Sequence, residues 1–204
     1  HEFAHAWMAR VLGDDTADRE GRLSLNPAVH IDPVGTLLLP VMMLVFSGGS
    51  GGGFFGWAKP VPYNPTRFKR SVSMRTGTVL VAAAGPMSNI VLASIVTLVM
   101  GLLIRFGFIG EASGALFKLG GSMIAVNVGL AIFNLIPLPP LDGSKVLSGL
   151  LPIDLARSYE SLTERAGMFP LLAIVIFGGA IMVVPMIYVI TFLQGTMLPL
   201  IAGV

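Results

Sequence analysis

The sequence predicts an all-α polytopic membrane protein, a helical bundle, because its charged residues are few and are absent from long stretches. Hydrophobic residues make up 54% of the 204 residues, charged residues make up 12%, and the mean hydropathy is +0.82. A soluble domain carries about 25% charged residues. We expect one membrane-embedded domain over residues 1–204. Asp, Glu, Lys and Arg are absent from residues 33–58, 77–104, 119–141 and 166–204.

The last three of these stretches are long enough for a bilayer-spanning helix, which needs about 20 apolar residues. They predict spans at residues 77–104, 119–141 and about 168–193. Residues 34–47 are apolar but short, which favours a re-entrant or interfacial element.

A glycine cluster at residues 48–53 indicates a flexible joint, and the run 54–63 after it is rich in aromatic residues and prolines. This composition favours an extended strand or hairpin near the membrane interface over a helix. We therefore expect a small membrane-associated β element in an otherwise helical fold.

Residues 1–12 are predicted to form a helix that ends at Gly13. The motif His1-Glu2-Phe3-Ala4-His5 already lies inside this helix, so we expect the sequence to be N-terminally truncated. Residues 13–32 are polar and are predicted to form an aqueous loop.

The distribution of positive charge predicts the orientation in the membrane. Placing residues 10–75 and 142–165 on one side puts eleven of the thirteen Lys and Arg residues there. The positive-inside rule makes that side cytoplasmic. The net charge of +2 is small and no basic run alternates with aromatics, so we expect no nucleic-acid partner. Because the chain has no cysteine, disulfides and thiolate metal ligands are excluded.

All three histidines lie in the first thirty residues, and two of them are four positions apart. Positions i and i+4 share a helix face, so His1 and His5 are predicted to bind one metal ion. Glu2 would take a proton from a metal-bound water, as in the H-E-x-x-H motif of zinc peptidases. The alternative is a pair of helix histidines without a metal, but such residues are costly in a membrane helix that gives them no function.

A catalytic zinc site has three protein ligands and one open position for water. The candidate for the third ligand is Asp142, which follows the second predicted span and is expected at the same membrane depth as the two histidines. Its position also suits the N-cap of a helix that begins near Ser144. The residues by themselves leave both roles open.

Five motifs follow one another from residue 1 to about residue 150. In this pattern the chain resembles the site-2 protease family (M50) of intramembrane zinc metalloproteases, in its compact prokaryotic branch without PDZ or CBS domains. The motifs are residues 1–5 (HEFAH), 26–35 (NPAVHIDPVG), 55–62 (FGWAKPVP), 84–89 (AGPMSN) and 134–143 (NLIPLPPLDG).

The resemblance implies a Zn2+ cofactor with His1, His5 and Asp142 as its ligands and Glu2 as the catalytic base. It also implies that Asn134 handles substrate near the metal, although a membrane asparagine could equally hold two helices together. The implied activity is hydrolysis of peptide bonds within or near transmembrane segments. The expected partners are a transmembrane protein substrate and the lipid bilayer, in a prokaryotic cell membrane with the active site towards the cytoplasm.

Three further polar residues favour structural roles. His30 lies in a polar loop and is expected to be hydrogen-bonded, with a gate or a partner of the metal site as the alternative. Asp32, which precedes a proline, is expected in a turn. Asn89 is expected in helix packing, after Gly85 and Pro86, which would allow a local break in the helix.

Two rival functions use the same features. One is a catalytically silent membrane scaffold, against which the presence of every expected catalytic residue argues. The other is a polytopic transporter, whose intramembrane polar residues would line a solute path. Zinc content and chelator-sensitive cleavage of a transmembrane substrate separate the three functions.

Overall fold

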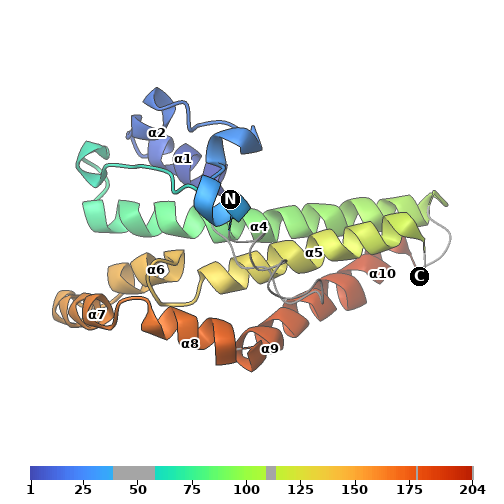
Figure 1. The fold of residues 1–204 in the computed structure, drawn as a ribbon. Coiled ribbons are helices and arrows are strands. Elements are labelled where there is room, and N and C mark those ends of the chain that lie inside the picture. The colour runs from blue at the N-terminus through green and yellow to red at the C-terminus, as the bar shows by residue number, and fades with distance from the viewer. Residues whose placement is uncertain (39–57, 109–113, 178, 204) are drawn as a thin grey trace. The chain divides into compact units, whose positions relative to one another are not determined.

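The computed structural model describes residues 1–38, 58–108, 114–177 and 179–203, and these residues form helices joined by loops (Figure 1). They divide into two compact units, His1–Gly77 and Thr78–Val204. No β-strand occurs among the described residues, so the all-α part of the prediction is confirmed. Residues 58–63 of the segment expected to be extended contain no strand, and residues 54–57 lie outside the described residues. The small β element stays a prediction.

The first unit contains the N-terminal helix that the sequence predicts. Helix α1 ends with Leu12 as its C-cap, and Gly13 follows with φ of +109°, a conformation that stops the helix and favours glycine. Residues 34–38 of the apolar stretch 34–47 belong to a π-helix, and its remainder and the glycine cluster lie outside the described residues. The helices of this unit are α1 (Glu2–Val11), α2 (Thr16–Arg19), two 3-10 helices (Pro27–His30 and Pro65–Arg67) and the π-helix (Pro33–Leu38).

The polar segment 13–32 is not a fully solvated loop, in contrast to the prediction. Arg19 and Glu20 are exposed, as expected, but Asp14 is 0% exposed and Arg22 is 5% exposed. Both buried charges are hydrogen-bonded, which offsets the cost of removing them from water. Charge in the sequence therefore marked this segment as polar without showing which side chains turn inward.

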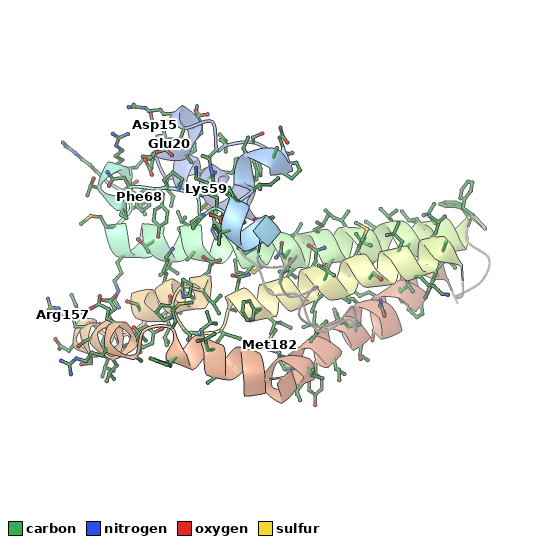
Figure 2. The ribbon with its side chains drawn as sticks, in the orientation of Figure 1. Asp15, Glu20, Lys59, Phe68, Arg157 and Met182 are labelled. Carbon is green, nitrogen blue, oxygen red and sulfur yellow. The ribbon has the colours of Figure 1, made fainter. Side chains whose placement is uncertain are left out.

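Small apolar side chains form the centre of the first unit. Ala6, Ala17 and Val61 are buried in one cluster, and Leu23 packs against it. In the same unit Phe68, labelled in Figure 2, is 8% exposed and stacks on Tyr63 with ring centroids 6.5 Å apart.

The second unit holds the long apolar helices. Three helices are long and apolar enough to cross a membrane: Met74–Arg105, Ala115–Asn134 and Met182–Ala202. The elements are α4 (Met74–Arg105, whose first turn belongs to the first unit), α5 (Ala115–Asn134), α6 (Asp142–Leu150), α7 (Ile153–Ala166), α8 (Phe169–Phe177), α9 (Gly179–Ile190), a π-helix (Thr191–Met197) and α10 (Leu198–Ala202).

Two predicted spans differ from the structure in where they begin or end. The second span was predicted to reach residue 141, but α5 ends at Asn134, shortly before Pro137, Pro139 and Pro140, which cannot continue a helix. The third was predicted at about residues 168–193, but the helical stretch long and apolar enough to cross a membrane is Met182–Ala202, so both of its ends lie later in the sequence. The absence of charged residues identifies an apolar segment, but it does not identify the residue at which the helix ends.

The spanning helices pack on one another through small residues and buried aliphatic side chains. A Cβ at Gly120 of α5 would overlap the Met100 side chain of α4, so glycine allows these helices to approach closely. Pro86 lies inside α4, which continues through it, so the predicted local break does not occur. The buried core consists of Ala93, Met100, Ile124, Val128, Leu193 and Leu198.

Large apolar side chains also face outward along the spanning helices. Val91 and Ile95 of α4, Val126 of α5 and Ile187 of α9 are each about half exposed or more. Lipid is an apolar solvent, so these side chains need no protein partner within a bilayer. Helix α7, which carries the labelled Arg157 in Figure 2, is by contrast rich in charged residues. We conclude that the chain is a membrane protein.

Candidate metal centre

Two of the candidate metal ligands lie together on α1. His1 is the N-cap, and one turn later the amide of His5 donates to the His1 carbonyl at 3.3 Å. The two imidazole rings lie edge to face, with centroids 4.7 Å apart. Two nitrogens bound to one zinc ion at about 2.0–2.1 Å lie at most about 4.2 Å apart. Ring nitrogens at this centroid separation can satisfy that limit, so the pair fits a shared metal ion.

Local sequence explains why this motif forms a short, well-ended helix. Alanine has the highest helix propensity, and Ala6 and Ala9 are 1% and 0% exposed, so they also allow close packing. Glu2 lies in the first turn and Arg10 in the last, where each complements the helix dipole. The sequence around both histidines therefore favours a regular helix.

The candidate base Glu2 shares a face of α1 with Ala6, four residues later. Ala6 is buried in the cluster that includes Val61. Val61 is therefore part of the same buried cluster as the residue one turn after Glu2.

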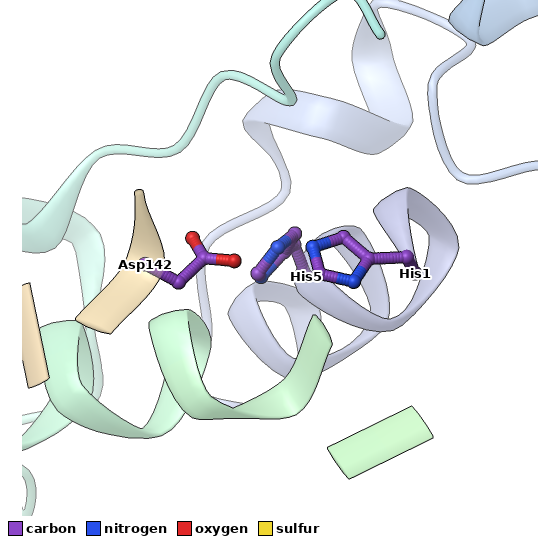
Figure 3. Close-up of side chains that lie close together, drawn as sticks. All are labelled: His1, His5 and Asp142. Carbon is purple, nitrogen blue, oxygen red and sulfur yellow. The ribbon is translucent and has the colours of Figure 1, made fainter. Parts of the chain in front are cut away.

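The third candidate ligand, Asp142, is the first residue of α6 and belongs to the second unit. Figure 3 shows the three side chains, His1 and His5 on consecutive turns of α1 and Asp142 at the start of α6. The N-cap of α6 is Leu141, whose backbone is extended, and not Asp142. The capping alternative raised by the sequence is thus not what the structure has. Two imidazoles and a carboxylate make a donor set suited to zinc.

Gly143 is a residue of this region that sequence reasoning missed. A Cβ at position 143 would overlap the carbonyl oxygens of Leu135 and Ile136, which follow the end of α5. These atoms belong to the backbone and cannot swing aside. The start of α6 therefore packs directly on the α5–α6 connection, and the glycine that follows Asp142 in the motif was the available signal. Ser144 adds a hydrogen bond from Oγ to the Leu141 carbonyl at 2.7 Å.

Asn134, the candidate for substrate handling, is the last residue of α5 and is partly buried. Its Nδ2 donates to the carbonyl of Leu130 in its own helix at 2.9 Å. Asn127, two turns earlier, makes the same bond to Met123 at 2.8 Å. This bond of Asn134 lies within α5. Its side-chain oxygen is a second polar group, so the sequence alternatives of substrate handling and of a bond between helices both stay predictions.

His30 lies at the end of a 3-10 helix in the first unit. Its Nε2 lies 2.9 Å from the carbonyl oxygen of Ser24, a distance that fits an Nε2–H donor in the tautomer protonated there. Its Nδ1 is buried without a hydrogen-bond partner among the described residues. The hydrogen bond agrees with the structural role expected for this histidine.

The two other polar residues also have structural surroundings. Asp32 accepts hydrogen bonds at Oδ1 from the amides of Val34 and Gly35, at 2.9 and 2.7 Å, and so organises the first turn of the π-helix Pro33–Leu38. Asn89 is 4% exposed within α4, as expected for a packing residue.

Comparison with known proteins finds relatives along most of the chain. Residues 110–178 match the family model described as Peptidase family M50. The chain is 42% identical over 154 residues to the "Putative zinc metalloprotease YwhC" of Bacillus subtilis (strain 168), a match that covers 74% of this chain and 64% of that protein. It is 32% identical over 144 residues to a protein of the same description, Rip2, of Mycolicibacterium smegmatis, covering 70% of this chain and 49% of the relative.

The chain thus spans between about half and about two thirds of the length of these two relatives. No solved structure matches it.

Proposed function

We propose that this chain, which belongs to peptidase family M50, is the catalytic part of a zinc metalloprotease that cleaves peptide bonds within or near transmembrane segments. The observation that carries the proposal is the HEFAH turn of α1, with its two imidazole rings 4.7 Å apart and a glutamate between them in sequence. The membrane-spanning helices of the same chain support a substrate that lies in the bilayer.

His1, His5 and Asp142 would hold the zinc ion as two nitrogen ligands and one oxygen ligand. Three protein ligands leave one position open, which is the arrangement of catalytic zinc sites. When bound, zinc polarises a carbonyl group and lowers the pKa of a bound water molecule to about 7.

Glu2 would act as general base and then as general acid. Its carboxylate accepts the proton of the attacking water and delivers that proton to the nitrogen of the leaving group. A carboxylate suits both steps because it returns to its starting protonation state after one turnover.

The amide of Asn134 would bind the substrate close to the reacting carbonyl. An amide nitrogen can donate to the oxygen on which negative charge develops. Its present bond to the Leu130 carbonyl is within its own helix, so exchange for a substrate oxygen breaks no contact between helices.

A helical substrate must be opened locally, because its peptide bonds are shielded by their own hydrogen bonds and lipid supplies no water. We assign this task to the segment 54–63, as a small β element that adds a strand to an unwound stretch of substrate. The active site would face the cytoplasmic side of a prokaryotic cell membrane, since eleven of the thirteen Lys and Arg residues lie in the segments 10–75 and 142–165.

The test uses the intact protein in lipid vesicles with a model single-span substrate. Glu2→Gln keeps the shape of the side chain and removes its basicity, so zinc content should stay at that of the wild type while kcat falls by about 10²–10⁴. Asp142→Ala should lose zinc as well as cleavage. Chelation should abolish cleavage by the wild type, and added zinc should restore it.

Each rival function gives a different result. A catalytically silent scaffold would bind zinc and cleave nothing, and a transporter would show neither zinc-dependent cleavage nor a loss of cleavage in Glu2→Gln. Full zinc content with normal cleavage in Asp142→Ala would remove that residue from the ligand set.

A further inference from the structure

Two buried charges of the first unit hold the backbone of residues 59–64. Arg22 donates from Nη2 to the carbonyl oxygens of Lys59 and Pro60, at 2.5 and 3.2 Å. It also donates from Nη1 to the carbonyl of Val29 at 2.7 Å, while the amide of Lys59 donates to the carbonyl of His30 at 2.9 Å. Arg22 thus joins two stretches of chain that are about thirty residues apart in sequence.

Asp14 holds the other end of the same segment. Its Oδ2 accepts a hydrogen bond from the amide of Asn64 at 2.5 Å. Its Oδ1 accepts from the amide and the hydroxyl of Thr16, at 3.1 and 2.5 Å. With Asp14 at 0% and Arg22 at 5% exposure, both charges are shielded from water and their hydrogen bonds are correspondingly strong. We call these two residues the main-chain clamp.

The clamped segment borders the catalytic face of α1. Val61, midway between the two ends of the clamp, is buried with Ala6 and Ala17. Ala6 lies one turn after Glu2 on the same helix face. A peptide that reacts beside Glu2 and runs along this face of α1 would pass segment 59–64.

Apolar packing alone could have fixed the segment at a lower cost, because a buried charge must recover the free energy of its lost hydration. Directional bonds to main-chain atoms give something that packing does not, namely a fixed path of the backbone. We propose that Asp14 and Arg22 are positioning residues, which hold segment 59–64 beside Glu2 so that the segment can bind the substrate backbone. This inference rests on the proposed function.

The first variant is Arg22→Lys, in the intact protein. A lysine ammonium keeps the charge but cannot present the forked donors that reach three carbonyls. We expect KM for the model substrate to rise about tenfold or more, which corresponds to the free energy lost with one hydrogen bond to a charged group. The kcat should stay within about twofold of the wild type and the zinc content should not change. Arg19→Lys is the matched control, because Arg19 is 66% exposed and pairs with Asp15.

The second variant, Asp14→Asn, tests the other end of the clamp without removing a long side chain. One carboxylate oxygen becomes an NH₂ group, which cannot accept, so either the Asn64 amide or Thr16 loses its partner. The KM effect should resemble that of Arg22→Lys. Asp15→Asn is the control, because this carboxyl is exposed and bonds to the Arg19 side chain. That hydrogen bond holds the pKa of Asp15 below its usual value, so the control also replaces a charged carboxylate.

Two readouts separate this inference from the proposed function. Hydrogen exchange of the Lys59 and Asn64 amides reports the clamp without any catalysis, and both amides should lose protection in the clamp variants but not in the controls. Affinity for uncleaved substrate, measured in the Glu2→Gln background, should fall about tenfold with Arg22→Lys.

Three results in the clamp variants would overturn the positioning role. The first is faster amide exchange with unchanged substrate affinity, and the second is unchanged amide exchange. The third is a loss of zinc in step with the loss of cleavage. A zinc-loaded wild type that binds substrate and cleaves nothing would instead overturn the proposed function. Amide exchange and substrate affinity of the clamp variants would then still decide the role of the clamp.

Discussion

The two regions that carry the candidate ligands are ordered in opposite ways. In the α1 region, buried polar side chains order the neighbouring chain: Asp14 and Arg22 bond to main-chain groups of residues 59–64. At the start of α6, position depends on the lack of a side chain, since Gly143 lets the helix approach the carbonyls of Leu135 and Ile136. A region with neighbouring polar loops can use directional hydrogen bonds, whereas a region at the end of apolar helices relies on close packing.

The largest expected effect tests whether the α6 region also takes part in the chemistry. Asn134→Ala should lower kcat by about 10²–10³ with zinc retained, the usual loss when one donor to a developing oxyanion is removed. Asn127→Ala is the matched control, because Asn127 makes the same bond within the same helix two turns away. Single-turnover cleavage of the model substrate measures both. Equal losses in the two variants would show that Asn134 acts only within α5.

The next effect concerns the close packing at α6. Gly143→Ala forces the start of the helix away from the α5–α6 connection, and so displaces Asp142. Zinc affinity should fall about 10–100-fold, as when the groups that orient a metal ligand are disturbed. Gly121→Ala serves as control, since its Cβ would meet only the Gln194 side chain, at an ordinary 3.6 Å. Competition with a calibrated chelator gives the affinities, and equal values for the two variants would contradict the role of Gly143.

The smallest effect tests the α1 region at its helix end. Gly13→Ala places a Cβ 3.0 Å from the Lys69 Cγ and 3.2 Å from its amide nitrogen, at φ of +109°. The backbone strain alone should cost about 1–2 kcal/mol, and the crowding adds to it. Gly21→Ala is the control for a positive φ without crowding, because Gly21 has φ of +67° and no neighbour within 4 Å. Hydrogen exchange of the Lys69 amide, which donates to the Leu12 carbonyl at 2.7 Å, should rise more in Gly13→Ala than in Gly21→Ala.

The features that local patterns determine were predictable from the sequence. The i, i+4 spacing of His1 and His5 placed them on one helix face, and charge-free stretches located the spans near residues 77–104 and 119–141. The end of α5 was placed too late because apolarity was counted to residue 141 while the prolines stop the helix before it.

Features that depend on distant residues were not predictable. Asp14 and Arg22 appear in the sequence as ordinary charges of a polar loop, and only the return of the chain at residues 59–64 makes them interior groups. Gly143 could be identified as part of a motif. The need for a glycine there, which is the close approach of the Leu135 and Ile136 carbonyls, becomes visible only in three dimensions.

The clamp has a consequence for how this protein can change. Arg22 bonds to the carbonyls of Lys59 and Pro60, and both of these residues are exposed. Substitutions at position 59 therefore leave the carbonyl in place, and new side chains can be offered to a passing peptide at little cost in folding. With the substrate role proposed for segment 59–64, substrate preference and structural integrity would be separable, which makes residue 59 a practical position for attaching a photocrosslinker or for selecting altered specificity.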